Sequence, residues 1–521
     1  MEIVDNTAVK LLVPDYMVSH IQNNIEKSEV INNKGSLVEV LVYWGLTEMT
    51  RLNQLISFKN PLPSPMSRDY DWPGTFKPFE HQRVTAEFLS INRRAFCFNE
   101  AGTGKTSSAL WAADYLMKQG EVKRVLVICP LSIMHSAWQD DVFSTCMHRS
   151  VAIAHGASSK REKIIDNKEY EIVIINYDGV GIVKENIAKG GFDLIIIDEA
   201  NAYKSPSTIR WKTLAKLITP DTRLWLMTGT PAAQSPLDAF GLAKLVCPHR
   251  VPKFSAAWRD KVMYQVTRFK WVPKKTAKDD VFKALQPAIR FSKEDCLDLP
   301  DVMYQTREVP LTPVVQRYYK NLKDQFLIEA AGEQISSVNA AANLSKLLQI
   351  SGGAVYTDKK EVVEFDIRPR LSALDEVLDQ TENKVLVFVP FRHTIEVVAK
   401  HLNKQGISTE IINGSVSAND RARIITQFQS LDDPRVLIIQ PQSASHGVTL
   451  TRADTIVFWS PVISVETYLQ CIARIDRYGQ KNKMTVVHIQ GSEVEKKMYA
   501  MLQGKVDLHT KLVDLYREIL E

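Results

Sequence analysis

A glycine-rich loop near residue 100 joins an apolar strand to a helix. The stretch FNEAGTGKTSSALW, residues 98–111, has the spacing of a phosphate-binding loop at Gly102, Gly104, Lys105 and Thr106. Glycines let the backbone approach a phosphate, and a helix N-terminus presents free N–H groups to the anion. We therefore expect a nucleotide triphosphate site here, with Lys105 on the β/γ-phosphates and Thr106 on Mg²⁺. Asn99 replaces the usual first glycine, and the alternative is a glycine turn that starts an ordinary helix.

Two acidic residues follow a later apolar strand. In DLIIIDEAN, residues 193–201, the strand ends at Asp198 and Glu199. Ligands bind at the carboxyl ends of strands in open α/β sheets, so both carboxylates are candidates for chemistry. Asp198 suits the partner of Mg²⁺, and Glu199 suits the group that polarises an attacking water. Without the upstream loop, Asp198 and Glu199 could equally well be the polar end of an ordinary strand with no role in chemistry.

A pair of arginines lies near the end of the chain. Arg474 and Arg477 are three residues apart in QCIARIDRYGQ, residues 470–480, and a helix would place both on one face. Arginines supplied to a γ-phosphate can accelerate hydrolysis by about 10³–10⁵-fold. The alternative is a solvated basic helix face.

Two sets of short apolar runs must position these residues. Runs this short and this apolar are typical of strands buried on both faces, which indicates parallel sheets flanked by helices. The first set is 94–98, 124–129, 171–176, 193–198 and 223–227, and the second is 384–389, 408–413, 435–440, 454–459 and 484–489. The sequence therefore predicts an α/β protein with two doubly wound units.

The remaining segments differ in composition. Residues 311–349 are rich in Ala, Leu, Gln and Lys and predict helices, while residues 1–70 carry no recognisable motif. We expect five segments, namely an N-terminal appendage (1–70), a first, ATP-binding lobe (71–310), a mostly helical insertion (311–365), a second lobe (366–505) and a C-terminal helix (506–521).

Bulk composition excludes several classes of protein. The 521 residues are 45% hydrophobic with a net charge of +5, which is compatible with a polyanion partner but does not establish one. No apolar run approaches the ~20 residues that span a bilayer, so we expect no membrane association. Six scattered cysteines without a C-x-x-C pair predict neither a zinc site nor disulfides and fit the cytoplasm of a bacterium or a phage-infected host.

Taken together and in this order, the motifs resemble a superfamily II helicase core, and finer features resemble its SWI/SNF-type branch of double-stranded DNA translocases in the compact version of bacteriophages and prophages. The segments that carry this resemblance are FKPFEHQRVTAEFL (76–89), CPLSIMHSAWQDD (129–141), INYDGV (175–180), SASHGVTLTRADTIVFWSP (443–461) and RIDRYGQ (474–480). The resemblance implies two RecA-like P-loop lobes, and hydrolysis of ATP with Mg²⁺ coupled to movement along duplex DNA. Remodelling of forks, junctions or bound proteins is one possible outcome of such movement.

The resemblance also implies roles for particular residues. ATP would contact Gln82, which reads adenine, and the loop residues Gly102, Thr103, Gly104, Lys105 and Thr106. The catalytic residues would be Lys105, Asp198, Glu199, Arg474 and Arg477, with Mg²⁺ on Thr106 and Asp198. The nucleic acid would lie near Ser132, Asn176, Tyr177 and Thr449 without sequence preference. Asn201 departs from the family, which has a histidine that couples the ATP state to other motifs.

Two other functions share parts of this pattern. A strand-separating DNA or RNA helicase would use every one of these catalytic residues. A factor that remodels proteins, acting on a polymerase, would use residues 1–70 as its binding module. The sequence leaves protein partners, polarity, step size and oligomeric state open.

Overall fold

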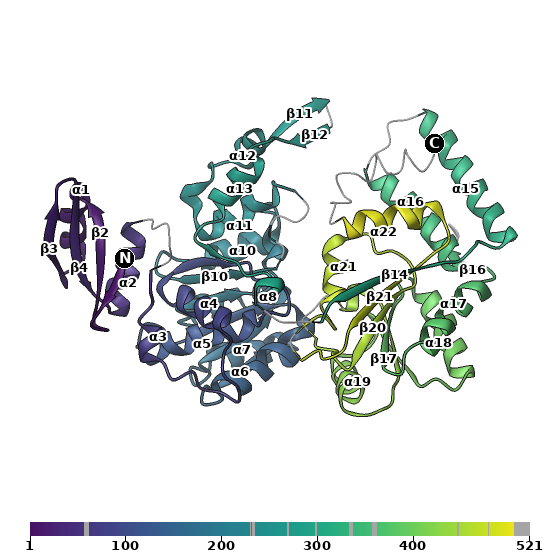
Figure 1. Cartoon of the computed structure of the whole chain (residues 1–521), viewed down its shortest axis with the longest axis horizontal. Coiled ribbons are helices and arrows are strands. Elements are labelled where there is room, and N and C mark those ends of the chain that lie inside the picture. The colour runs from purple at the N-terminus through teal and green to yellow at the C-terminus, as the bar shows by residue number, and fades with distance from the viewer. Residues whose placement is uncertain are drawn as a thin grey trace. The chain divides into compact units, whose positions relative to one another are not determined.

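The computed structural model describes residues 1–56, 62–229, 231, 235–267, 270–296, 300–332, 337–356, 362–444, 448–477 and 479–504. The expected C-terminal helix, 506–521, lies outside these residues. Nearly all described residues up to Cys296 form one compact unit, unit 1, and those from residue 300 onward form unit 2. Each unit contains a parallel sheet flanked by helices (Figure 1), as the sequence predicts.

Unit 1 begins with a small antiparallel module. Its four strands pair in the order β1-β2-β4-β3, and buried valines and leucines alternate along β2 and β4. Its elements are β1 (Glu2–Val4), β2 (Ala8–Pro14), α1 (Asp15–Asn24), β3 (Ser28–Lys34), β4 (Leu37–Tyr43) and α2 (Leu46–Leu55). Asn53 of α2 donates to Asn92 Oδ1 at 2.7 Å, which ties the module to the main body of unit 1.

The main sheet of unit 1 has seven parallel strands in the order β13-β5-β10-β9-β6-β8-β7. The strands are β5 (Arg94–Cys97), β6 (Val125–Cys129), β7 (Val151–Ala154), β8 (Ile172–Asn176), β9 (Leu194–Ile197), β10 (Arg223–Met227) and β13 (Ala288–Ile289). Alternate residues of each central strand face opposite cores. In β9, for example, Leu194 and Ile196 join one buried cluster, while Ile195 and Ile197 join the other. This two-sided burial is why the strands are continuously apolar.

Helices cover both faces of this sheet and connect its strands (Figure 1). They are α3 (Met66–Asp69), α4 (Glu80–Ile91), α5 (Lys105–Lys118), α6 (Asp140–Cys146), α7 (Ser158–Asp166), α8 (Tyr177–Ile182), α9 (Lys184–Lys189), α10 (Ile209–Leu217) and α11 (Asp238–Val246). After α11 come α12 (Ser255–Val262), β11 (Met263–Thr267), β12 (Lys270–Pro273), α13 (Ala277–Ala284) and α14 (Lys293–Cys296).

Unit 2 repeats this plan with six parallel strands in the order β14-β21-β20-β17-β19-β18. The strands are β14 (Val302–Glu308), β17 (Lys384–Phe388), β18 (Thr409–Ile412), β19 (Val436–Ile439), β20 (Ala453–Phe458) and β21 (Met484–Gln490). The sequence assigned residues up to 310 to the first lobe, whereas β14 pairs along its whole length with β21. Polar residues interrupt β14 because it is an edge strand, so it lacks the apolar run that marks the other strands.

The helices of unit 2 include two in the segment that the sequence predicted to be helical. They are α15 (Pro313–Gly332), α16 (Ser337–Gly352), α17 (Arg368–Asp379), α18 (Arg392–Lys404), α19 (Ala418–Ser430), α20 (Pro441–Ala444), α21 (Val465–Ile472) and α22 (Glu493–Gln503). A short hairpin of β15 (Ala354–Tyr356) and β16 (Val362–Glu364) follows α16. Across the described parts of both units, no helix is both long enough and apolar enough to cross a membrane.

One buried ion pair holds α17 to α22. Arg370 donates through one nitrogen to both carboxylate oxygens of Glu495, at 2.8 Å each, and both side chains are almost fully buried. Glu495 also accepts the backbone N–H groups of Gly491 and Ser492 at the start of α22. The pair therefore fixes a helix start and an inter-helix contact together.

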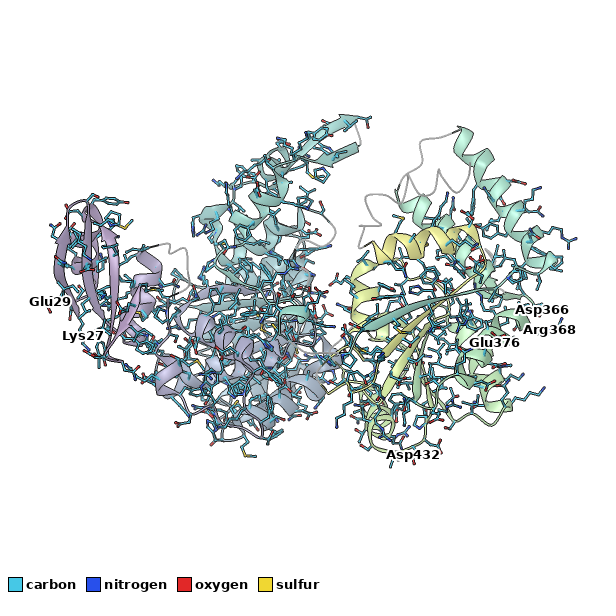
Figure 2. The ribbon with its side chains drawn as sticks, viewed as in Figure 1. Lys27, Glu29, Asp366, Arg368, Glu376 and Asp432 are labelled. Carbon is cyan, nitrogen blue, oxygen red and sulfur yellow. The ribbon has the colours of Figure 1, made fainter. Side chains whose placement is uncertain are left out.

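We predict that Arg370→Met lowers the free energy of unfolding of unit 2 by about 3–5 kcal/mol, because it leaves a buried carboxylate without its charge partner. The matched control is Arg368→Met. Arg368 pairs with Asp366 at 2.7 Å at the surface (Figure 2), so its loss should leave the free energy of unfolding nearly unchanged. Urea unfolding of the two variants measures the difference, and equal losses would contradict the assignment.

Candidate active site

The predicted residues of unit 1 gather at one edge of its sheet. The glycine-rich loop follows β5, Ser132 follows β6, Tyr177 follows β8 and Asp198 follows β9. All four strands are parallel, so their carboxyl ends meet at the same edge. In the sheet, β10 and β9 lie between β5 and β6, although β6 is the next strand after β5 in the sequence. Open α/β sheets bind ligands at the carboxyl ends of strands where the strand order changes in this way.

The two glycines of the loop are required by its backbone. Gly102 and Gly104 have φ angles of 89° and 79°, in the left-handed region that favours glycine. Gly104 is also the N-cap of α5, and a Cβ atom there would lie 2.0 Å from Gln82 Nε2. The loop therefore delivers Lys105 and Thr106 as the first two residues of α5, beside the N–H groups that a helix start leaves free.

Two side chains of α4 hold the loop in shape. His81 Nε2 lies 2.8 Å from the carbonyl oxygen of Thr103, and Gln82 Nε2 donates to the same oxygen at 3.3 Å. Gln82 Oε1 accepts the N–H of Phe79 at 2.9 Å. The residue predicted to read adenine thus lies directly against the loop. The sequence analysis did not identify His81, although the same FKPFEHQ segment contains it.

Asn99 explains why this loop has no first glycine. Its side chain is fully buried, with Oδ1 accepting the N–H of Phe291 at 3.0 Å and Nδ2 donating to Thr85 Oγ1 at 2.8 Å. These bonds connect β5 to α4 and to the segment after β13. Glycine could form neither bond, so an amide side chain here positions the start of the loop. The sequence analysis noted Asn99 only as a departure.

Lys105 and Asp198 form the electrostatic centre of the site. Lys105 Nζ donates to the carbonyl oxygens of Asn99 at 2.9 Å and Glu100 at 3.3 Å, so the ammonium lies within the curve of the loop. Asp198 is 6% exposed. Burial raises the pKa of Asp198 above its ordinary value, while the positive charge of Lys105 and a hydrogen bond from Trp138 act in the opposite direction.

Two hydrogen-bond donors orient the carboxylate of Asp198. Trp138 Nε1 donates to Oδ2 at 3.0 Å, and the N–H of Glu199 donates to Oδ1 at 2.9 Å. Among the described residues, no group of three His, Cys, Asp or Glu side chains could hold a metal ion. A single carboxylate is nevertheless what Mg²⁺ uses when substrate phosphates supply its other ligands. The donor set at Asp198 and Thr106 therefore fits Mg²⁺ bound together with a nucleotide.

Glu199 has an unusual backbone conformation. Its φ and ψ angles are 47° and 55°, which for a residue with a side chain costs about 1–3 kcal/mol. Tyr177 compensates from the end of β8, which lies beyond β6 in the sheet, because its hydroxyl donates to the carbonyl oxygens of Asp198 at 2.7 Å and Glu199 at 3.2 Å. Strained residues held in this way concentrate at active sites.

Three of the four residues predicted to face nucleic acid lie at or just after strand ends at this edge of the sheet, namely Ser132, Asn176 and Tyr177. The fourth, Thr449, belongs to unit 2. Asn176 Oδ1 accepts from Arg161 at 2.8 Å, and burial raises the pKa of the Tyr177 hydroxyl well above its ordinary value. Tyr177 and Arg210 border an open cavity of about 430 Å³ between α8 and α10. Ser132 lies in a short helical turn after β6. The sequence analysis did not predict that Tyr177 contacts the acidic loop.

The helix predicted to carry both arginines ends before them. In unit 2, α21 ends at Ile472, so Arg474 and Arg477 lie in the turn that follows. Arg474 is 3% exposed and donates to the carbonyl oxygens of Gln470 at 2.7 Å and Val448 at 3.0 Å. Arg477 donates to Thr449 Oγ1 at 2.8 Å. The arginine segment is therefore bonded to the segment that contains the predicted nucleic-acid residue Thr449.

A polar cluster anchors α5 from its middle. Asp114 accepts from the hydroxyl of Tyr70 at 2.6 Å and from Arg149 at 2.6 Å, and its carboxylate is fully buried. Burial acts to raise the pKa of Asp114, but the hydrogen bonds from Tyr70, Arg149 and His148 outweigh it and lower the pKa. This fixes the helix whose first residue is Lys105.

Comparisons with known proteins agree with this arrangement. Residues 51–365 match the SNF2-related domain, and residues 369–479 match the helicase conserved C-terminal domain. The two matched segments contain the glycine-rich loop, the acidic pair and both arginines.

Similar proteins come from phage and from animals. The chain is 25% identical over 425 residues to protein p41 of Acyrthosiphon pisum secondary endosymbiont phage 1, covering 77% of this chain and 89% of that protein. It is 23% identical over 465 residues to chromodomain-helicase-DNA-binding protein 1-like of Danio rerio, covering 84% of this chain but 44% of that protein. This chain thus spans less than half of the animal relative.

Among solved structures, the SWI2/SNF2 ATPase core of Sulfolobus solfataricus in complex with dsDNA is similar with a TM-score of 0.42 and 20% identity, covering 85% of this chain and 94% of that one. The family assignment rests on the domain matches. The match to the SNF2-related domain covers more than half of the sequence and includes the site described above. The chain therefore belongs to the SNF2-related family of superfamily II and is a helicase-type ATPase.

Proposed function

We propose that this ATPase uses Mg²⁺·ATP to move along duplex DNA without reading its sequence. The observation that supports the proposal most directly is the group of Lys105, Asp198 and Glu199 at one sheet edge, with Tyr177 bonded to the acidic loop. A motor needs a hydrolysis site that is connected mechanically to its track. Tyr177 offers that connection, because it is itself predicted to face the nucleic acid.

Binding of ATP is assigned to the first unit. The N–H groups of the loop from Gly102 to Thr106 would donate hydrogen bonds to the phosphates, and Lys105 would exchange its two carbonyl partners for phosphate oxygens. Gln82 would contact the adenine while holding Thr103. When bound at Thr106 and Asp198, Mg²⁺ would neutralise the developing charge of the phosphates.

Glu199 is assigned to the attacking water. Its backbone carbonyl accepts the hydrogen bond from Tyr177 in this strained conformation, so that bond would help to set the direction of the side chain before substrate binds. A preoriented base reduces the reorganisation that the transition state requires. Because Tyr177 bonds both acidic residues through their carbonyl oxygens, a shift of Tyr177 upon DNA binding would reorient Glu199.

Arg474 and Arg477 are assigned to the γ-phosphate, which requires that unit 2 close upon the nucleotide. Their bonds to Val448 and Thr449 link them to the segment proposed to contact DNA. The contacts to DNA would come from Ser132, Asn176, Tyr177 and Thr449, and they would address the phosphate backbone. The six free cysteine thiols are compatible with action in the cytoplasm.

We predict that Lys105→Ala reduces DNA-stimulated ATP hydrolysis to background, because the phosphates lose their only loop-borne cation. The fold should persist, since Lys105 bonds only to loop carbonyls, and the melting temperature should change by less than about 3 °C. Phosphate release and thermal melting measure the two effects. Undiminished turnover would rule out this phosphate site.

The two arginines should behave differently. Arg477→Ala is expected to lower turnover by about 10³-fold with little change in stability, since its side chain is partly exposed. Arg474→Ala should lower turnover and also destabilise unit 2 by about 1–3 kcal/mol, because two carbonyl groups lose a buried charged donor. Steady-state ATPase rates and urea unfolding of both variants provide the test. Full activity of Arg477→Ala would exclude its role at the γ-phosphate.

Duplex DNA should stimulate ATP hydrolysis, and its binding should weaken about tenfold or more between ~50 and ~200 mM salt. A translocase is further expected to displace the third strand of a triplex while leaving a tailed duplex paired. A panel of duplex, single-stranded, forked and junction DNA with RNA measures the preference. An ATPase rate that no nucleic acid alters would refute the translocase proposal, and separation of the tailed duplex would indicate a strand-separating helicase.

A further inference from the structure

The positive charge of the chain is concentrated in one short segment. Residues 251–285 contain nine lysines and arginines and three aspartates, a net charge of +6, whereas the whole chain has a net charge of +5. The other residues together therefore carry −1. A polyanion would meet its strongest attraction at this segment, which consists of α12, the β11–β12 hairpin and α13 and is called the arm below.

The base of the arm is firmly mounted on unit 1. Trp258, Val262 and Ala284 belong to the buried cluster on one face of the main sheet, and Trp258 Nε1 donates to the carbonyl oxygen of Pro236 at 3.1 Å. Arg259 lies over the ring of Trp271 at 4.2 Å, which braces the hairpin against α12. A rigid base allows the arm to present its charges in a fixed arrangement.

The hairpin itself extends from this base. Its two strands pair only with each other in the described structure, and Figure 1 shows them extending beyond α12, away from the seven-stranded sheet. Tyr264 and Val266 are 49% and 53% exposed. Lys274 Nζ donates to the carbonyl oxygen of Asp260 at 2.6 Å and closes the hairpin at its base. The hairpin is thus a separately stabilised projection.

Four lysines of the arm are exposed and without an acidic partner. Among the described residues, carboxylates pair with Lys261 and Arg259 of the arm. No ion pair in the described structure involves the exposed residues Lys253, Lys275, Lys278 and Lys283. Binding of a phosphate to an unpaired lysine costs little free energy, because no existing ion pair has to break first. Lys253 precedes α12, Lys275 and Lys278 lie around the start of α13, and Lys283 lies near its end. Positions spread in this way fit an extended anion better than a small one.

We propose that the arm is a second DNA-binding element, which contacts the phosphate backbone of duplex DNA through its unpaired lysines. This inference rests on the proposed function and adds a part that none of the family motifs contains. Duplex DNA carries one charge per ~1.7 Å of axis, so several spaced lysines can each neutralise one phosphate. The arm contributes no residue to the ATP site, so it sets the affinity for DNA and leaves the maximal rate of hydrolysis unchanged.

The test reverses two of these charges in the full chain, as Lys275→Glu with Lys278→Glu. The matched control makes the same change of charge on α18, as Lys400→Glu with Lys404→Glu, both exposed in unit 2. Fluorescence anisotropy with a 40-base-pair duplex measures affinity across a series of salt concentrations. If each lysine contacts one phosphate, the arm variant binds roughly 50-fold more weakly near ~0.1 M salt, and the slope of log K against log salt falls by about 2.

Steady-state ATPase assays supply the second measurement. The arm variant should need more DNA for half-maximal stimulation but reach the same maximal rate as the wild type. A second variant replaces Tyr264–Val272 with a short Gly-Ser linker, which spares the main sheet because the hairpin pairs only with itself. That variant removes two further positive charges of the arm, Arg268 and Lys270, so it should also bind DNA more weakly, and circular dichroism checks its fold.

The outcomes separate this inference from the function on which it rests. If the wild type binds duplex DNA and is stimulated by it, but both arm variants match the control in affinity and salt dependence, then the arm is not a DNA contact and the inference is overturned. If the wild type neither binds DNA nor is stimulated, the translocase proposal fails and this inference fails with it. Weaker binding with an unchanged maximal rate, confined to the arm variants, supports the inference.

Discussion

The negative charge of Asp198, held in a buried position, is the constraint on which the site depends. An ionised carboxylate that is 6% exposed is unfavourable unless nearby donors and cations compensate it. Trp138 and the Glu199 N–H supply the donors, and Lys105 supplies a positive charge from the neighbouring loop. These groups come from the ends of different strands, so only the assembled sheet can bring them together. A divalent cation bound at Asp198 would add a second positive partner for this carboxylate.

Much of the fold follows from the sequence because the central strands are covered on both faces. Every strand of the two expected sets exists, since a short β-branched run such as VLVIC is typical of a strand that is covered on both faces. Three strands of the two main sheets were not predicted. β7 is a four-residue strand at a sheet edge, β13 has two residues, and β14 is an edge strand with polar residues. The N-terminal sheet alternates apolar and polar residues without any chemical motif, so its sequence indicates no function.

The site was less completely predictable than the fold. The spacing of GTGKT and the position of DE after a strand identify Lys105 and Asp198, because phosphate and metal chemistry fix those residue types. The supporting contacts are different in kind, since they join residues far apart in sequence. Asn99 bonds to Phe291, and Tyr177 bonds to the backbone after β9, and no local spacing predicts either contact. The position of Arg474 in a turn was likewise not visible from an R-x-x-R pattern that also suits a helix.

The alternation of β9 has a consequence for how this sequence can vary. Ile195 and Ile197 face one core, Leu194 and Ile196 face the other, and Asp198 follows at once. Inserting or deleting a single residue in this strand would exchange the two sets and turn the carboxylate to the wrong side. A change of length in β9 is therefore expected to harm the site more than a change of length in a connection that carries no site residue.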